Sequence, residues 1–538
     1  MKKFVFVLCF LLFTASILFA GGTSESKPAA DAGTSKDVVT YVGMADGSSR
    51  QQASKKDTVK FRINADLASL DPHMIAGQGN EAIVLSNVYE GLFRADSDAE
   101  GNTRINLGLA ESFEYADAEQ KELVVHLRKG IKFHNGDELK ADDVVFSLNR
   151  SIEAGYNEAI MSVIKGVEKV DDYTVKISLP YAYGAIQSVL ACDSCYIVNK
   201  KTFEGKAKEE TARIECGTGP YTVAKWEAGS KIFIEAFEDY WRGPAAIKHG
   251  EYIIIQDNNA SMIAFENKEF DVTNHTATID ELVIRKDTKH YGYSLCTTTG
   301  CGRSVVFNVS PESPFNDIRL RQAVAMSIDK KAIIEAAYDG VGVEGGLAIP
   351  PIYEECPSDV QPFAYDLEKA KQLVKEAGLE GTTVKVTIAD QDQYKKPMII
   401  LQQNLKEIGI NLEIDAMARA AWNEKVLKKG DFEMTYYPLL AKYADVDSLL
   451  YPLHSSNKSG MFTTLNDPYI DEMLEKGRSL GKGEERNKVY GELCKYLTEQ
   501  AYFIPVQNIT RFVPYRIGLK GVTASPQQKL PMYNYYWE

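Results

Sequence analysis

Helix and strand patterns alternate along residues 317–414, and this alternation constrains the possible folds most. The expected elements are, in order, helices at 317–328, 330–338 and 367–377, a strand at 384–389, a helix at 397–408 and a strand at 411–414. Asp329 and Asp366 precede helices as N-cap residues, and Gly378 is placed to end the helix that Asp366 begins. Helices that alternate with strands are typical of an α/β layer, so we predict an α/β fold for this region.

The first half of the chain adds shorter strands and a further helix. Residues 123–127 and 173–179 alternate apolar with polar side chains, as half-buried strands do. Residues 141–150 have helical spacing, and Asp142 and Asp143 stand near the positive N-terminus of this helix. We therefore interpret these two aspartates as a helix start and not as a catalytic carboxylate pair.

The composition suits a chain with a large buried core. Of its 538 residues, 44% are hydrophobic and 25% are charged, which are ordinary globular values that exclude disordered and disulfide-scaffold classes. Lysine and arginine total 61 against 75 acidic residues, so the net charge is −14. A net acidic protein repels a polyanion, and we predict no nucleic-acid partner.

The N-terminus has the pattern of a secretory signal peptide at residues 1–20. Two lysines precede an apolar run, and small residues precede a cleavage point after Ala20. The alternative is a retained membrane anchor, for which the run is at the short limit. Residues 21–57 are mostly small or polar and predict a flexible leader, with the fold beginning near Thr58. Cleavage would leave 59 basic against 75 acidic residues, a net charge of −16, on a protein exported to the periplasm or the cell surface.

The cysteines leave several pairings open. Cys9 lies inside the signal, too early to carry a lipid at the cleavage point. The mature chain would keep Cys192, Cys195, Cys216, Cys296, Cys301, Cys356 and Cys494. The C-x-x-C spacing of Cys192 and Cys195 is compatible with a redox pair, a metal half-site or a local disulfide, but no second C-x-x-C supports zinc. Cys296 and Cys301 could close a hairpin-like loop, and the sequence does not assign the pairs.

Enzyme motifs are absent or lack their structural context. Gly340, Gly342 and Gly345 match G-x-G-x-x-G, but the dinucleotide fingerprint needs a strand before it and a helix after it, and here a helix precedes. No G-x-S-x-G, H-E-x-x-H or Walker A motif occurs, and the seven histidines are scattered. We therefore predict no catalysis, no cofactor and no metal site. A secreted hydrolase, the alternative from another class, would need a nucleophile, a carboxylate pair or a metal triad.

Nine groups of short motifs point to one family. They lie at residues 70–72, 88–92, 127–144, 217–221, 240–243, 307–308, 314–329, 365–378 and 504–505. The most specific is Leu-Arg-Lys-Gly-Ile-Lys-Phe-His-Asn-Gly-Asp at 127–137. In this order the motifs resemble the peptide- and nickel-binding family, family 5, of the extracellular solute-binding proteins that serve ABC importers. The resemblance covers roughly residues 58–538.

The resemblance implies an α/β, two-lobed periplasmic-binding-protein fold, similar to class II, with an extra subdomain in the first lobe. Mapped onto this sequence, lobe one would cover 58–290 and 508–538, with the subdomain at about 106–200, and lobe two would cover 295–505. The lobes would close on a ligand by a hinge motion. The implied protein is a monomeric receptor in the periplasm that captures oligopeptides and delivers them to the permease subunits of an ABC transporter.

Residues 431–450 carry the most information about the ligand. In the peptide receptors of this family, the segment has a tryptophan and, three residues later, an aspartate that pairs with the free amine of the peptide. Aligned without gaps, Leu439 stands at the tryptophan and Lys442 at the aspartate. Two like charges about 4 Å apart repel by roughly 4 kcal/mol at an effective dielectric near 20, so a lysine here disfavours an ammonium group.

Two interpretations of Lys442 remain. Either it faces the ligand, which would then be an anionic compound, an oligosaccharide or a nickel chelate, or the segment shifts locally so that Asp445 or Asp447 holds a peptide amine. Oligopeptide leads because it is the frequent ligand of the family, although the stretch 349–362 lacks the arginine that dipeptide receptors use for the carboxylate. The candidate ligand-binding residues are Asp71, His73, Tyr436, Tyr437, Lys442, Tyr443 and Asp445.

Overall fold

The computed structural model describes residues 54–75, 79–98, 103–274, 278–297, 300–456 and 460–538. The predicted signal peptide, 1–20, and the predicted leader, 21–57, lie outside the described residues except for 54–57. These last residues of the leader contact the C-terminal end of the chain, because Lys55 N donates to Trp537 O at 3.0 Å and Trp537 N donates to Ser54 Oγ at 2.8 Å. Among the residues described, none of the helices combines the length and the apolar character that a membrane span requires.

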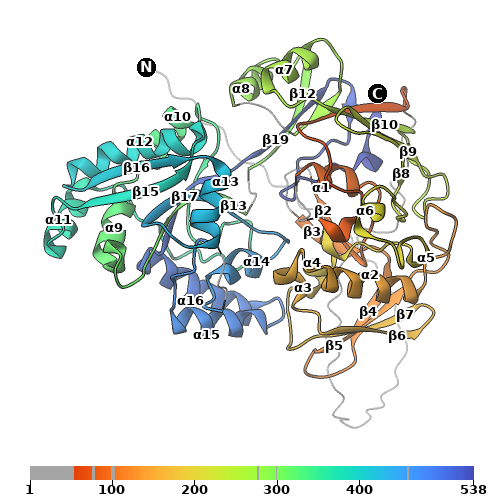
Figure 1. Cartoon of the computed structure of the whole chain (residues 1–538), viewed down its shortest axis with the longest axis horizontal. Helices are drawn as coiled ribbons and strands as arrows, with labels where there is room; N and C mark the ends of the chain where they lie inside the picture. The colour runs from red at the N-terminus through yellow and green to blue at the C-terminus, as the bar shows by residue number, and fades with distance from the viewer. Residues whose placement is uncertain (1–53, 76–78, 99–102, 275–277, 298–299, 457–459) are drawn as a thin grey trace, which may run out of the picture. The chain divides into compact units, whose positions relative to one another are not determined.

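A seven-stranded sheet has the strand order β12-β19-β11-β1-β10-β9-β8. Its strands are β1 (Thr58–Ile63), β8 (Tyr221–Glu227), β9 (Lys231–Ala236), β10 (His249–Ile254), β11 (Val272–Thr273), β12 (Tyr291–Cys296) and β19 (Arg511–Arg516). β1 is parallel to β10 and β11, whereas β19 returns from near the C-terminus and is antiparallel to β11 and β12 (Figure 1). The sheet therefore joins residues from both ends of the chain.

A separate antiparallel sheet has the order β4-β5-β7-β6. Its strands are β4 (Ala110–Tyr115), β5 (Glu122–Leu127), β6 (Gly166–Asp171) and β7 (Thr174–Ser178), and α2 (Ala141–Ala154) packs on it. The predicted strands at 123–127 and 173–179 and the predicted helix at 141–150 are thus present. Asp143 accepts hydrogen bonds from Lys140 N at 3.0 Å and Lys200 N at 2.9 Å, which confirms its interpretation as a helix-start residue.

The remaining short elements of this part lie between these strands along the chain. They are β2 (Phe93–Ser97), β3 (Thr103–Leu107), α1 (Asn80–Leu85), α3 (Glu158–Met161), α4 (Ile186–Leu190), α5 (Lys200–Phe203), α6 (Lys208–Thr211), α7 (Asn258–Glu266) and α8 (Thr278–Lys286). β2 and β3 form an antiparallel pair. Near the C-terminus, β20 (Leu519–Lys520) and β21 (Tyr536–Trp537) form another.

A six-stranded sheet organises residues 301–508, with the order β14-β18-β13-β17-β15-β16. Its strands are β13 (Cys301–Phe307), β14 (Val343–Glu344), β15 (Thr383–Ala389), β16 (Asn411–Met417), β17 (Met434–Leu440) and β18 (Phe503–Asn508). Its helices are α9 (Ile318–Met326), α10 (Lys330–Ala337), α11 (Leu367–Ala377), α12 (Asp392–Glu407), α13 (Arg419–Trp422), α14 (Val446–Leu450), α15 (Pro468–Arg478) and α16 (Glu484–Gln500). β15 is parallel to both β16 and β17, so the predicted α/β layer is present.

Most predicted helix ends in this sheet region are confirmed, and one is wrong. The side chains of Asp329 and Asp366 accept hydrogen bonds at the starts of α10 and α11, and Gly378 ends α11 with a left-handed φ of 68°. The helix predicted to begin at Pro397 begins instead at Asp392. Proline has no N–H to donate to the carbonyl four residues earlier. That carbonyl, of Gln393, accepts from the Tyr338 hydroxyl at 2.7 Å, so the helix tolerates Pro397.

Two large hydrophobic cores underlie these sheets. The first gathers buried side chains from residues 59–296 and 513–537 together with Tyr443, and the second gathers buried side chains from 305–506. We call the elements built on the first core the first lobe and those built on the second core the second lobe. The chain passes between the lobes from β12 to β13 and again from β18 to β19. The residue boundaries predicted for the lobes and the subdomain stay predictions.

Candidate functional site

The segment between β17 and α14 forms a fixed turn at the carboxyl end of a central strand of the second lobe. Asp445 is the N-cap of α14, and its Oδ1 accepts from Asp447 N at 2.9 Å. Ser448 Oγ accepts from Lys442 N at 2.6 Å and from Tyr443 N at 3.2 Å. Because polar side chains hold both ends of the turn, the backbone of 442–448 is a rigid platform.

Two adjoining cavities flank this turn and share Ala441, Ala444, Pro526 and Gln527. The first, of about 50 Å³, is lined by 191–194 and 526–529 of the first lobe and by 440–444 of the second. The second, of about 280 Å³, is lined by Thr103 and Gln527 of the first lobe and by 352–355 of the second. Both lobes therefore contribute to the walls of each cavity.

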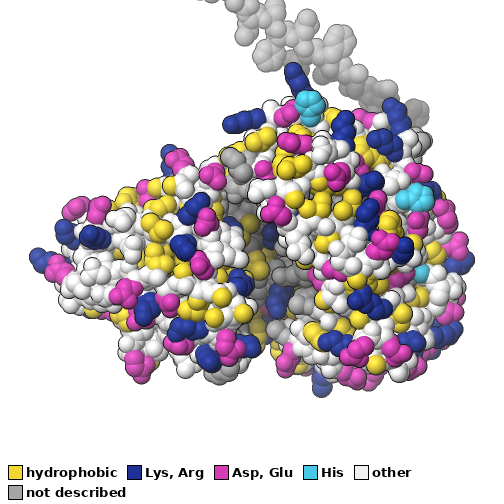
Figure 2. All heavy atoms as spheres, turned by 45° about the horizontal axis from the view of Figure 1, so that its top comes forward, with side chains coloured by type: hydrophobic (Ala, Val, Ile, Leu, Met, Phe, Trp, Pro, Cys, Tyr) yellow, Lys and Arg dark blue, Asp and Glu magenta, His cyan; other side chains and the backbone are white. Residues whose placement is uncertain are grey.

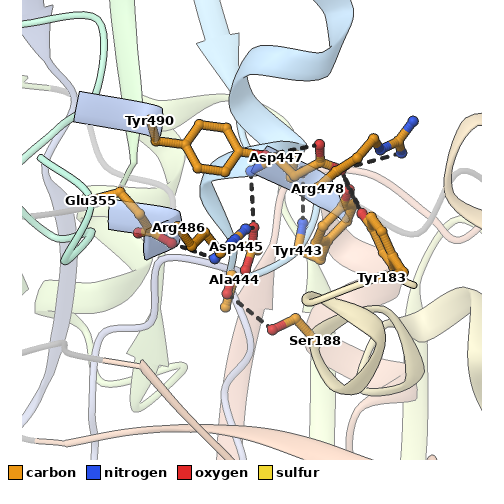
Figure 3. A network of polar contacts seen from close by, with 11 residues as sticks. Tyr183, Ser188, Glu355, Tyr443, Ala444, Asp445, Asp447, Arg478, Arg486 and Tyr490 are labelled. Atoms are coloured by element: carbon orange, nitrogen blue, oxygen red, sulfur yellow. Dashed lines mark hydrogen bonds and ion pairs between the residues drawn. The ribbon is translucent and has the colours of Figure 1, made fainter. Parts of the chain in front are cut away.

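Asp445 is buried and its charge is compensated from within the second lobe. Its carboxylate forms an ion pair with Arg486, which also pairs with Glu355 (Figure 3). Burial opposes the charge of Arg486, but the two carboxylates outweigh that cost and hold its pKa above the ordinary value. Burial also raises the pKa of Glu355, and Arg486 opposes this rise. Asp445 therefore serves a buried ion-pair network.

Asp447 is also buried, and it receives donors from both lobes. It accepts from Tyr183 of the first lobe at 2.5 Å and from Tyr443 at 3.0 Å, and it lies 3.4 Å from a guanidinium nitrogen of Arg478 (Figure 3). Tyr183 and Tyr443 are themselves 2.7 Å apart between their hydroxyl oxygens. Burial raises the pKa of Tyr183 well above its usual value, so this hydroxyl stays protonated and able to donate.

Further contacts fasten the same part of the first lobe to the second lobe. Ser188 Oγ donates to Ala444 O at 3.1 Å, and Gly184 N donates to Arg478 O at 3.1 Å. A Cβ on Gly184 would lie 2.0 Å from Leu480 O, a distance that no side chain can adopt. The lobes thus meet through polar groups of the chain itself, directly beside the two cavities.

The sequence of this chain matches a known family of proteins. Residues 104–461 match the sequence model of the bacterial extracellular solute-binding proteins, family 5 Middle. The chain belongs to family 5 of these solute-binding proteins. The prediction of this family, made from the short motifs, is confirmed.

Individual members of the family resemble the chain over most of its length. The heme-binding protein A of Haemophilus influenzae is 27% identical over 79% of this chain and 83% of its own length. The dipeptide-binding protein of Escherichia coli is 26% identical over 80% of this chain and 85% of its own length. Among solved structures, the periplasmic binding protein AgaA of A. tumefaciens R10, in complex with agropinic acid, is 26% identical with a TM-score of 0.73 and covers 89% of this chain and 99% of its own. The two-lobed periplasmic-binding-protein fold is confirmed.

Lys442, which the sequence comparison predicts at the position of the peptide receptors' aspartate, is exposed and lines the first cavity. Its backbone is bonded on both sides, since its N–H donates to Ser448 and its carbonyl accepts from the Cys192 thiol. Among the residues described, its ammonium group forms no ion pair with a carboxylate. Asp445 and Asp447 are the alternatives to the family aspartate. Asp445 is already paired with Arg486, and Asp447 is already paired with Arg478, which disfavours this alternative.

The remaining candidate residues lie in two different places. Tyr436 and Tyr437 lie in the second lobe, and Asp71 and His73 lie in the first lobe. Tyr436 is buried, with its hydroxyl 3.0 Å from that of Tyr338, and Tyr437 packs on Trp422 with ring centroids 4.6 Å apart. Tyr437 accepts a hydrogen bond from Arg419. Neither tyrosine lines the two cavities, whereas Tyr443 lines the first and Asp445 lines the second.

Asp71 and His73 lie within the first lobe and form a closed network with Arg150. Arg150 donates to the two carboxylate oxygens of Asp71 at 2.8 and 2.5 Å and to His73 Nδ1 at 3.0 Å, while His73 Nε2 donates to Tyr196 O at 2.8 Å. Burial lowers the pKa of His73 to about 4, so the imidazole is neutral. The structure brings only Lys442, Tyr443 and Asp445 together at the cavities.

Sequence reasoning did not select several residues that line the first cavity. Gln527 and Lys529 come from the C-terminal segment, and Cys192 comes from a short turn after α4. The C-x-x-C spacing was the signal that could have drawn attention to Cys192. Burial raises the pKa of its thiol to about 12 and also raises that of Cys195, so both thiols are protonated near neutral pH. Within the described part of the chain, no group of three His, Cys, Asp or Glu side chains is arranged to hold a metal ion.

Proposed function

We propose that this family 5 protein captures oligopeptides between its two lobes and delivers them to the permease subunits of an ABC importer. The observation that carries the proposal is the pair of adjoining cavities whose walls come from both lobes. A ligand that touches both lobes favours their association, which is how a hinged receptor couples binding to a change of shape. The name of the relative from Escherichia coli, a dipeptide-binding protein, supports a peptide ligand.

The size of the cavities favours a short peptide. The larger one measures about 280 Å³, at the lower limit of the roughly 300–1,000 Å³ that is usual for small-molecule sites. The polar contacts of Tyr183 and Ser188 with the second lobe close off the space beside them. We therefore propose a ligand of a few residues and no catalytic step.

An anionic compound that is not a peptide is the second candidate, and Lys442 favours it. The lysine lines the cavity, and the two nearby aspartates that could attract a peptide amine are paired with arginines. AgaA, which is 26% identical to this chain, was solved in complex with an acid, agropinic acid. The two candidates differ in whether the ligand carries peptide bonds.

The place of action and the partners follow from the transport role. We propose that the protein works in the periplasm as a monomer, without nucleic acid. Figure 2 shows basic and acidic side chains interspersed over the face in view, which suits a soluble receptor that does not bind a polyanion.

Mass spectrometry of the small molecules released from the purified protein tests the proposal. We expect masses of short peptides that fragment at amide bonds, and we expect added peptides to be recovered uncleaved. Ala441→Trp, which fills the wall shared by both cavities, should abolish ligand recovery, whereas Ala207→Trp at the exposed N-cap of α6 should not. A non-peptide anion in the wild type would support the second candidate, and cleavage of the peptides would contradict the receptor function.

A further inference from the structure

Three cationic side chains follow one edge of the sheet of the second lobe. β15 is parallel to β16 and β17, so the carboxyl ends of these strands meet at the same edge, where open α/β sheets bind their ligands. Arg419 and Lys442 each stand two residues beyond a strand end, after β16 and β17. Arg303 lies on β13 opposite Pro438, near the same end of β17. The edge that carries Lys442 beside the cavity therefore continues to two arginines.

Arg303 is half-buried and is oriented by neutral partners. Its two terminal nitrogens donate to Gln507 Oε1 at 2.6 Å and to Gln393 Oε1 at 2.8 Å, and its guanidinium lies 4.9 Å from the centre of the Tyr338 ring. Its Nε is buried without a hydrogen-bond partner. A buried N–H that makes no hydrogen bond costs free energy. The Nε–H of Arg303 is therefore a donor that still lacks an acceptor.

Arg419 is held on an aromatic surface in the same way. Its guanidinium lies 4.6 Å from the centre of the Tyr437 ring and 5.0 Å from that of Trp422. Its Nε donates to Asn423 Oδ1 at 2.9 Å, and it also donates to the Tyr437 hydroxyl. The aromatic rings and the amide fix the direction of the guanidinium without neutralising it.

One residue links the surroundings of the two guanidinium groups. Tyr394 packs on Tyr437, the ring beside Arg419, with ring centroids 5.7 Å apart, and it directly follows Gln393, to which Arg303 donates. Burial raises the pKa of Tyr394, and the charges of Arg303 and Arg419 both oppose this rise. In the described part of the second lobe, neither arginine forms an ion pair with a carboxylate, whereas Arg478 and Arg486 do. Two like charges in a partly buried site repel each other, and an anion placed between them removes this cost.

We propose that Arg303 and Arg419 form a carboxylate-binding subsite of the ligand site. The inference rests on the proposed function and deepens it, because it assigns an acidic group to the ligand. The planar fork of arginine donates two parallel hydrogen bonds to a carboxylate, and these charge-assisted bonds are the strong ones. The carboxylate is the C-terminal group of a peptide or an acid group of another compound, and both have the same chemistry.

Citrate is the first probe, because it carries carboxylates but neither an amine nor a peptide bond. Isothermal titration at low ionic strength should detect citrate binding by the wild type. The double variant Arg303→Gln and Arg419→Gln should bind it about tenfold to a hundredfold more weakly, as expected when charge-assisted hydrogen bonds are lost. Arg319→Gln, an arginine of the same lobe that pairs with Asp317, should leave citrate affinity unchanged. Arg419→Lys, which keeps the charge and loses the fork, is the second variant and should also weaken binding.

A random tripeptide library, with free or amidated C-termini, separates this subsite from peptide capture itself. Preferential binding of the free acids by the wild type, lost in the double variant, supports the subsite. Equal binding of both libraries with citrate affinity unchanged by the substitutions overturns the subsite and leaves peptide capture intact. Binding of neither library, together with citrate binding that the substitutions weaken, overturns peptide capture and supports the subsite. A wild type that does not bind citrate and does not distinguish the libraries overturns the subsite.

Discussion

Two neighbouring regions of the second lobe differ in whether their charged side chains are paired with an opposite charge. Within the turn at 442–448, Asp445 and Asp447 are buried and each is paired with an arginine. Along the sheet edge that this turn follows, Arg303 and Arg419 are held by neutral amides and aromatic rings. The buried region is complete without a ligand, whereas the edge has positive charge that no carboxylate among the described residues compensates.

The contrast separates structural charges from charges that are left for a ligand. A buried ion pair is costly to form, and its main consequence is that removal of one partner leaves a buried charge alone. An arginine that is oriented but not neutralised keeps its electrostatic attraction for an incoming anion. Substitutions in the buried network should therefore change stability, whereas substitutions along the edge should change the affinity for a ligand.

The largest effect should come from Arg486→Met, which leaves Asp445 and Glu355 buried without their cation. We expect the free energy of unfolding to fall by about 3–5 kcal/mol, measured by urea denaturation at pH 7. The further changes Asp445→Asn and Glu355→Gln, made in the same variant, should restore part of the loss because they remove the stranded charges.

Lys428→Gln is the matched control for that measurement. Lys428 is exposed and pairs with Glu424 one turn earlier on the chain. Exposed pairs of this kind contribute little to stability because water and salt screen them, so its loss should be small. Equal losses for Arg486→Met and Lys428→Gln would mean that the buried network does not hold the turn in place.

The network of Asp71, His73 and Arg150 in the first lobe should make the free energy of unfolding depend on pH. His73 has a pKa of about 4 in the folded chain against about 6.5 when unfolded, so between these values the unfolded chain binds more protons. Stability should therefore fall as the pH drops from 6.5 towards 4, by on the order of 3 kcal/mol. Asp71, whose folded pKa is lowered although burial opposes this, adds a loss below its unfolded value.

His73→Gln isolates this contribution, because an amide can still donate to Tyr196 O and accept from Arg150. Urea denaturation at pH 4.5 and 6.5 should show a smaller difference for the variant than for the wild type. The groups that face the imidazole are Asp71, Arg150 and Tyr196 O. An unchanged pH dependence would show that His73 is not the group that titrates.

The sequence predicted the scaffold better than the site for a physical reason. Cap residues such as Asp366 and period-two strands act locally, so a single sequence reveals them. The ion pairs of Asp445 and Asp447 join residues far apart along the chain, and so does the approach of Tyr183 to Asp447. Spacing along the chain carries no information about such contacts, and the resemblance to the family gave a position, at Lys442, but not its surroundings.

The candidates Tyr436 and His73 illustrate the same limit. Both are residue types that often contact ligands, but each faces a partner inside its own lobe. Arg303 and Arg419 stood in no motif, and only the register of the strands brings them to one edge. The signal that could have found Arg419 is its place shortly after the strand predicted at 411–414, whereas no strand was predicted at Arg303.

Tyr183→Phe should have a smaller effect than the loss of a buried charge. It removes one donor from Asp447, which keeps Tyr443 and Arg478, so we expect a loss of about 1–3 kcal/mol in the contact between the lobes. Hydrogen–deuterium exchange should become faster at 443–450 and at 183–192. Tyr156→Phe, on an exposed tyrosine of the first lobe, should leave both segments unchanged. Exchange equal to that of the wild type in Tyr183→Phe would mean that this bond does not join the lobes.

The smallest change in stability, and the sharpest test of the sheet edge, should come from Lys442→Asp. The side chain is exposed, so the free energy of unfolding should change by less than about 0.5 kcal/mol. Citrate affinity, measured by isothermal titration, should fall because an acid replaces a cation that lines the first cavity and lies on the same sheet edge as the two arginines. Peptides with a free amine should instead bind more tightly, since the substitution introduces the negative charge that the sequence resemblance predicts at this position in the family's peptide receptors. Affinities for both probes equal to those of the wild type would show that Lys442 does not face the ligand, and the ligand-facing part of the edge would then be restricted to Arg303 and Arg419.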